Sequence, residues 1–131
     1  MQSATQTPPV SKKRLLAGRI ISALPVLLLL FSGVMKLMKP PSVMQGFAGY
    51  GYPESLILVI GLLEIACTVV YAIPSTSILG AILLTGYLGG ATATHLRVGD
   101  AFFAPIALGV LVWGDLYLRD AQLRALLSMR R

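Results

Sequence analysis

A single carboxylic acid, Glu64, interrupts the apolar run "IGLLEIACTVV". Small or polar residues follow or precede it at offsets of three, four and seven, the spacing of one helix face: Gly61, Cys67, Thr68 and Tyr71. An ionised acid near the centre of a bilayer costs on the order of 2.5 kcal/mol or much more, so this face is expected to point away from lipid. Glu64 is therefore the first candidate for proton or ligand chemistry. The alternative is a hydrogen-bonding group that only fixes helix register.

Two basic side chains, Lys36 and His95, are expected to converge on Glu64. Helical side chains lean toward the N-terminus of their own helix, and the runs that carry Lys36 and His95 are antiparallel to the run that carries Glu64. The three side chains therefore tilt toward one region in the outer half of a bundle. We predict a polar pocket there, made of Glu64, Lys36, His95, Thr68 and Tyr71. The Lys36 backbone lies roughly 8 Å above that of Glu64, so an ion pair and a lysine that snorkels to the interface are both open interpretations.

The composition is that of a membrane protein. Of the 131 residues, 56% are hydrophobic and only 12% are charged, against roughly 25% charged in ordinary soluble domains. The net charge is +6, but the basic residues flank the apolar runs, and no aromatic residues interleave with them to stack on bases. We therefore expect a lipid bilayer as the partner and no nucleic acid.

Four stretches are long enough to cross a bilayer, at about 20 residues each: 15–37, 55–73, 77–96 and 101–118. They predict an all-α fold, a four-transmembrane-helix antiparallel bundle. The first loop, with "PSVMQGFAGYGYP", predicts a short helix lying at the interface, and an irregular loop is the alternative.

The basic residues also predict the orientation. Most of them lie on the side that holds both termini, so both ends are expected in the cytoplasm. The domain prediction is a disordered cytoplasmic tail over 1–14, a membrane domain over 15–118 and a basic cytoplasmic tail over 119–131. We expect an integral protein of the bacterial plasma membrane.

Glycines predict where helices approach each other closely. Gly86 and Gly90 form a GxxxG pattern in the third run, and Gly61 lies one turn before Glu64. Such residues let helix backbones meet inside lipid. We expect packing within the bundle, with dimerisation as the alternative. Near the end of the fourth run, Asp115 and Arg119 have the spacing of an i,i+4 ion pair.

The sequence offers little for metal or thiol chemistry. Cys67 is the single cysteine and His95 the single histidine, and no second ligand occurs at metal spacing. We therefore predict no metal site. His95 is either an interfacial hydrogen-bonding residue or part of a proton relay.

Three motifs together resemble the DoxX-like family of small four-helix membrane proteins. They are "FSGVMKL", "GLLEIA" and "ATATHLRVGD", in which the family pattern falls on Gly33 to Lys36, Gly61 to Glu64 and His95 to Asp100. The resemblance covers roughly residues 17–117. It implies kinship with a subunit of thiosulfate:quinone oxidoreductase, with a membrane component of methylamine-dehydrogenase maturation and with proteins of oxidative-stress complexes.

Three functions are open on this basis. The first is an accessory or assembly subunit that docks a protein partner or a lipid-like molecule and has no catalytic activity alone. The second is a quinone-linked oxidoreductase subunit in which Glu64, Lys36 and His95 line the pocket. The third is a small proton-coupled transporter gated by Glu64. No covalent cofactor is expected; a quinone is the one candidate cofactor, and a homo-oligomer could replace a protein partner.

Overall fold

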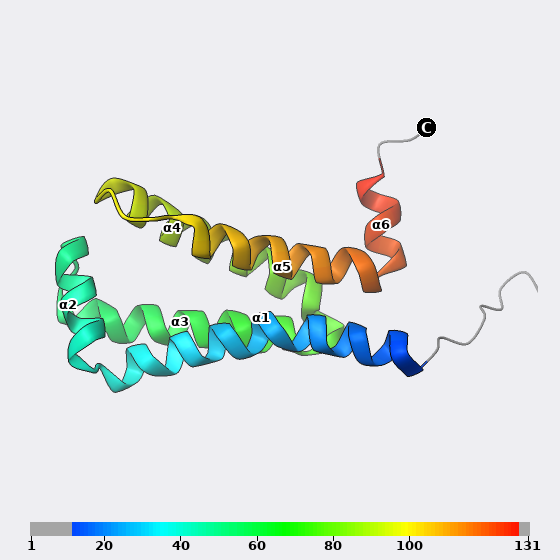
Figure 1. The fold of residues 1–131 in the computed structure, drawn as a ribbon, viewed down its shortest axis with the longest axis horizontal. Helices are drawn as coiled ribbons and strands as arrows, with labels where there is room; N and C mark the ends of the chain where they lie inside the picture. The colour runs from blue at the N-terminus through cyan, green and yellow to red at the C-terminus, as the bar shows by residue number, and fades with distance from the viewer. Residues whose placement is uncertain (1–11, 129–131) are drawn as a thin grey trace, which may run out of the picture.

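The computed structural model describes residues 12–128, which form six α-helices and one 3-10 turn and contain no β-strand (Figure 1). In chain order the elements are α1 (Lys12–Met38), α2 (Pro41–Tyr50), α3 (Glu54–Ala72), η2 (Pro74–Thr76), α4 (Ser77–Arg97), α5 (Phe103–Arg119) and α6 (Ala121–Leu127). The predicted all-α class is confirmed. The tail predicted to be disordered spans 1–14: residues 1–11 fall outside the described residues, whereas residues 12–14 belong to α1, so disorder was wrong for them.

Four long helices pack in a ring. α1 packs on α3, α3 on α4, α4 on α5, and α5 returns to α1. Figure 1 shows the α1–α3 pair and the α4–α5 pair close together at the end that carries α6, and farther apart toward α2. The short helix α2 stands across this wider end, where it contacts α3.

Proline and glycine set the limits of α2. Pro40 and Pro41 follow Lys39, whose φ is 52°, so the chain turns sharply after α1. At the other end Gly51 takes a left-handed φ of 81°, which glycine adopts without strain, and the Tyr52 amide bonds back to a carbonyl of α2. The helix predicted in the first loop is therefore present.

Three helical segments are long and apolar enough to cross a membrane: Leu16–Met38, Glu54–Ala72 and Pro74–Arg97. The fourth long helix, α5, has 17 residues. Large apolar side chains such as Phe31 and Val110, at 66% and 67% exposure, lie on the outside of the bundle. This surface suits contact with lipid tails rather than with water.

Two helix boundaries differ from the sequence-based expectation. α1 begins at Lys12, because the basic residues before the first apolar run continue the helix. The described part of the basic tail includes α6, which was not predicted. Asp120 caps α6, because its carboxylate accepts a hydrogen bond from the Leu123 amide at 3.0 Å.

The glycines pack differently from the expectation. A Cβ atom at Gly61 would lie 2.8 Å from Lys36 Cβ, so α3 meets α1 at this glycine. A Cβ atom at Gly86 or Gly90 would meet no atom of the described residues within 4 Å, so no described helix of the single chain packs closely on them, and dimerisation through them stays a prediction. Both glycines instead line a cavity, so the face of α4 that carries them borders open space. The tightest contact is instead at Gly80, against the Tyr71 backbone.

We predict that Gly80→Ala lowers the stability of the bundle by about 1–3 kcal/mol, because the new methyl group collides with the Tyr71 backbone. Thermal unfolding of the detergent-solubilised protein measures this. Gly89→Ala in the same helix is the control, since its Cβ atom enters open space. Equal melting temperatures for the two variants would contradict the predicted contact.

Candidate functional site

Glu64 forms a buried ion pair with Lys36. The Lys36 Nζ atom lies 2.8 Å from Glu64 Oε1, and the exposed fractions of the two side chains are 14% and 3%. Ser32 completes the cluster: its hydroxyl donates to the same carboxylate oxygen at 3.2 Å and accepts from Lys36 Nζ at 2.7 Å. A charge pair removed from water needs such additional hydrogen bonds to offset its desolvation.

Glycines bring the two charged side chains within reach. Gly33 lies one turn before Lys36 on α1, and Gly61 lies one turn before Glu64 on α3. A Cβ atom at Gly33 would lie 2.5 Å from Ile65, and one at Gly61 would lie 3.1 Å from the Gly33 carbonyl oxygen. Because neither has a side chain, α1 and α3 approach closely and the lysine spans the remaining gap.

A cavity of about 520 Å³ lies on the same side of the ion pair as α2. Its polar lining residues are Ser32, Lys36, Thr94 and His95. Its aromatic lining residues are Phe47, Tyr50, Tyr52 and Tyr87. Small or aliphatic residues complete the wall: Ile60, Leu63, Gly86, Gly90 and Ala91. Glu64 borders the cavity through its partners Ser32 and Lys36.

Two hydroxyl contacts join α2 and the following turn to the end of α4. His95 Nδ1 lies 2.7 Å from the Ala91 carbonyl, which can only accept, so Nδ1 carries the hydrogen. In the neutral ring Nε2 is then the acceptor for the Tyr50 hydroxyl at 3.2 Å. Burial, and then the negative charge of Asp100, raises the pKa of Tyr50, which keeps this hydroxyl protonated. Beside it, the Tyr52 and Thr94 hydroxyls lie 2.6 Å apart.

Arg97 adds a third link between α4 and this region. Its guanidinium donates to the Tyr50 carbonyl and lies 5.9 Å from the centre of the Tyr52 ring. The rings of Phe47, Tyr50 and Tyr52 in turn lie 5.6 to 6.2 Å apart, a spacing typical of aromatic clusters. Aromatic rings that are held from α4 therefore line the cavity on the side of α2.

Of the five residues of the predicted pocket, three lie at the cavity and two lie away from it. Lys36 and His95 line the cavity, and Glu64 lies directly behind its lining. Thr68 does not reach the cavity, because its hydroxyl donates to the Glu64 carbonyl of its own helix at 2.7 Å. Tyr71 also lies elsewhere, in contact with α5.

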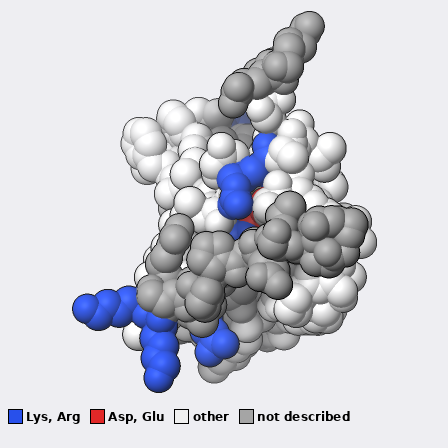
Figure 2. Space-filling model, turned by 90° about the vertical axis from the view of Figure 1, so that its right-hand side faces the viewer, with Lys and Arg blue, Asp and Glu red and all other residues white. Residues whose placement is uncertain are grey.

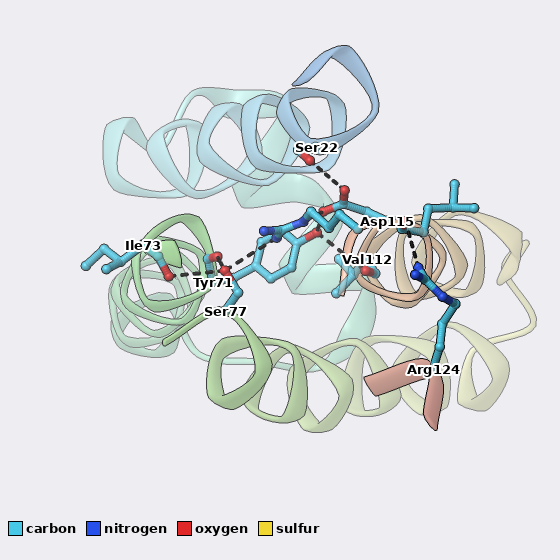
Figure 3. A network of polar contacts seen from close by, with 9 residues as sticks. Ser22, Tyr71, Ile73, Ser77, Val112, Asp115 and Arg124 are labelled. Carbon is cyan, nitrogen blue, oxygen red and sulfur yellow. Dashed lines mark hydrogen bonds and ion pairs between the residues drawn. The ribbon is translucent and has the colours of Figure 1, made fainter. Parts of the chain in front are cut away.

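Tyr71 belongs to a second polar cluster, centred on Asp115 (Figure 3). Asp115 is 2% exposed and accepts hydrogen bonds from Tyr71 and, at 2.5 Å, from Ser22. Arg119 Nε lies 3.1 Å from the same carboxylate, so the predicted Asp115–Arg119 pair is confirmed. The arginine also contacts the Ser77 hydroxyl at 3.4 Å. This cluster links α1, α3, α4 and α5, so its polar contacts hold the four long helices together.

Sequence reasoning missed several lining residues. Ser32 lies one turn before Lys36, which is a signal that could have placed it beside the ion pair. Tyr50 and Tyr52 belong to the predicted interfacial segment, but nothing in their spacing indicates that they reach across to Thr94 and His95. Tyr87, on α4, also lines the cavity.

We predict that Lys36→Met and Glu64→Gln each destabilise the fold by about 3 kcal/mol, because each leaves one charge of a buried pair without its partner. The double variant should cost less than the sum of the two. Unfolding of the purified protein from detergent micelles into a denaturing detergent measures the free energies.

The control combines Lys36→Met with Asp115→Asn, which lie in different clusters and should therefore be additive. Additive losses for the Lys36 and Glu64 replacements would contradict a direct ion pair.

Comparison with known proteins identifies the family of this sequence. A family model described as the DoxX-like family matches residues 20–114. Neither the curated proteins nor the solved structures give a match. The matched range includes the Lys36–Glu64 ion pair between α1 and α3 and the two glycines, Gly33 and Gly61, at which these helices approach. The chain belongs to the DoxX-like family.

Proposed function

We propose that this membrane protein binds a small lipophilic molecule with a hydrogen-bonding head group in the cavity between α1, α3 and α4. It would act as an accessory or assembly subunit of a larger membrane system. The observation that carries the proposal is the cavity of about 520 Å³ that ends on the Lys36 ammonium group and has aromatic walls. Ligand sites are typically about 300–1,000 Å³, mostly apolar, and contain a few placed polar groups.

The polar groups favour binding over catalysis by this chain alone. Lys36 donates to both Ser32 and Glu64, and His95 is engaged by Tyr50 and Ala91. These groups therefore stabilise one another and are suited to hold a fixed geometry. A ligand head group would add a hydrogen bond to Lys36 or to a tyrosine hydroxyl without dismantling this arrangement.

A quinone-linked oxidoreductase subunit is the second candidate, and one observation favours it. Hydrogen-bond donors from different elements line the cavity: Lys36 on α1, and the Tyr52–Thr94 hydroxyl pair, in which one of the two hydroxyl hydrogens is left free to donate. This arrangement suits a flat ring with a carbonyl group on each side. A bound quinone would supply the electron chemistry, while Lys36 and the aromatic residues would hold it.

Proton-coupled transport would require the Lys36–Glu64 pair to open in each cycle. Loss of proton flux into liposomes on Glu64→Gln would identify this function.

We further propose that α5 is a fourth membrane span, so that both termini lie in the cytoplasm. Its 17 residues give a length of about 25 Å, at the short end of the range for spanning helices. Lys and Arg side chains gather at the end of the bundle where α1 begins and α6 lies (Figure 2). Basic residues of this kind mark the cytoplasmic side.

Labelling of introduced cysteines tests this topology in a Cys67→Ser background. We predict that a membrane-impermeant thiol reagent labels Val98→Cys in intact cells, whereas Gln122→Cys reacts only after permeabilisation. The two residues lie before and after α5. Labelling of both from the same side would contradict a spanning α5, and the reverse pattern would contradict the orientation.

We predict that Gly90→Leu removes the bound molecule from the purified protein while leaving the fold intact. Gly90 lines the cavity, and a Cβ atom there meets nothing within 4 Å, so a leucine side chain fills the space without a backbone collision. Native mass spectrometry of protein extracted in mild detergent measures occupancy.

Gly89→Leu is the matched control, since Gly89 is equally open but does not line the cavity. Equal occupancy in the two variants, or no lipophilic molecule in the wild-type protein, would contradict the proposed function. A quinone in the wild-type preparation would favour the second candidate.

A further inference from the structure

A second hollow, of about 410 Å³, lies between α1 and α2. We call it the α1–α2 groove. It shares four lining residues with the cavity: Ser32, Lys36, Phe47 and Tyr50. The groove and the cavity are therefore neighbours separated by the same side chains.

We propose that the ligand is a single-chain amphiphile that reaches the cavity from the bilayer through the α1–α2 groove and keeps its hydrocarbon chain there. This inference rests on the proposed function, because it assumes that the cavity holds the head group. It adds the class of ligand, a membrane-resident molecule with a long chain, and the path by which it enters.

The position of the groove supports access from lipid. Phe31 lines it, is 66% exposed, and lies seven residues before the end of α1, which is about 10 Å along the helix. Because this end of α1 lies at the membrane surface, Phe31 is at the depth of lipid chains rather than of head groups. A ligand dissolved in water would not need an opening at this level.

The lining has the polarity that an amphiphile requires. Away from the cavity the groove is lined mainly by the apolar side chains of Phe31, Met35 and Val43, and Gly46 and Ser42 complete it. At its boundary with the cavity it reaches the Ser32 hydroxyl and the Lys36 ammonium group. A head group bound at Lys36 would leave its chain lying along the apolar part, in line with the lipid chains.

Two of the four side chains in the wall between the hollows, Phe47 and Tyr50, lie outside the buried core. Both rings lie on α2, which contains no buried residue and begins at Pro41, directly after Pro40. Tyr50 is held to α4 by its contacts with His95 and Arg97 rather than by core packing. A shift of these two rings would join groove and cavity without disturbing the buried core.

Phenol-headed probes that carry a photoreactive diazirine at the end of either an ethyl or a dodecyl chain test this path. We predict that the dodecyl probe labels Phe31, Met35 or Val43, and that Gly46→Leu lowers this labelling by about tenfold. Gly46 lines the groove but not the cavity, and a Cβ atom there meets nothing within 4 Å. The ethyl probe should label the cavity at Ile60 or Leu63 to the same extent in wild type and in Gly46→Leu.

Gly49→Leu is the matched control, because Gly49 is equally open on the same helix and lines neither hollow. Equal dodecyl labelling in Gly46→Leu and Gly49→Leu, with the ethyl probe still in the cavity, would overturn the α1–α2 path alone. Absence of ethyl labelling in the cavity of the wild-type protein would overturn the proposed function and this inference with it.

Discussion

A carboxylate buried among apolar helices has to be neutralised or paired, and here that requirement governs how α1 and α3 meet. Ionised Glu64 needs a cation and further donors, because the low dielectric of a bilayer leaves an isolated charge too costly. Lys36 and Ser32 supply them from α1. The lysine reaches the acid only because Gly33 and Gly61 let the two backbones approach. The ion pair therefore depends on the two glycines, and altering either the glycines or the charged residues changes the distance between α1 and α3.

The rest of the bundle is organised around two polar clusters at different depths. The Asp115 cluster ties all four long helices together where they lie close. The Lys36–Glu64 pair joins only α1 and α3, and toward α2 the α4–α5 pair is free to diverge. The space that results is filled incompletely, since α4 presents Gly86 and Gly90 there. Aromatic rings from α2 then cover it. The cavity thus follows from a difference between two levels of the bundle. At the Asp115 cluster polar contacts join all four long helices, whereas at the Lys36–Glu64 pair they join only α1 and α3.

The sequence was sufficient for the four long helices, for α2 and for the identity of the central acid, but not for α6. Apolar length and the Pro and Gly breaks gave the long helices and α2, because in a bilayer a helix is the only way to satisfy the backbone of an apolar run. The partners of each side chain were harder to predict. Tyr71 shares a helix face with Glu64, but at its depth the facing neighbour is α5, so it binds Asp115 instead. Gly86 and Gly90 carry a packing pattern, but the face of α4 on which they lie borders the cavity rather than a neighbouring helix. Such outcomes depend on helix tilt, which spacing along one chain does not contain.

The most direct measurement is solid-state NMR of the full chain in lipid bilayers, with ¹⁵N on lysine side chains and ¹³C on glutamate carboxyl groups. With Nζ of Lys36 2.8 Å from Oε1 of Glu64, we predict strong dipolar coupling between the Lys36 nitrogen and a carboxyl carbon that has the chemical shift of an ionised acid. Lys36→Met and Glu64→Gln should each abolish that signal. A protonated Glu64 with no coupling to Lys36 would contradict the ion pair and the cavity geometry built on it.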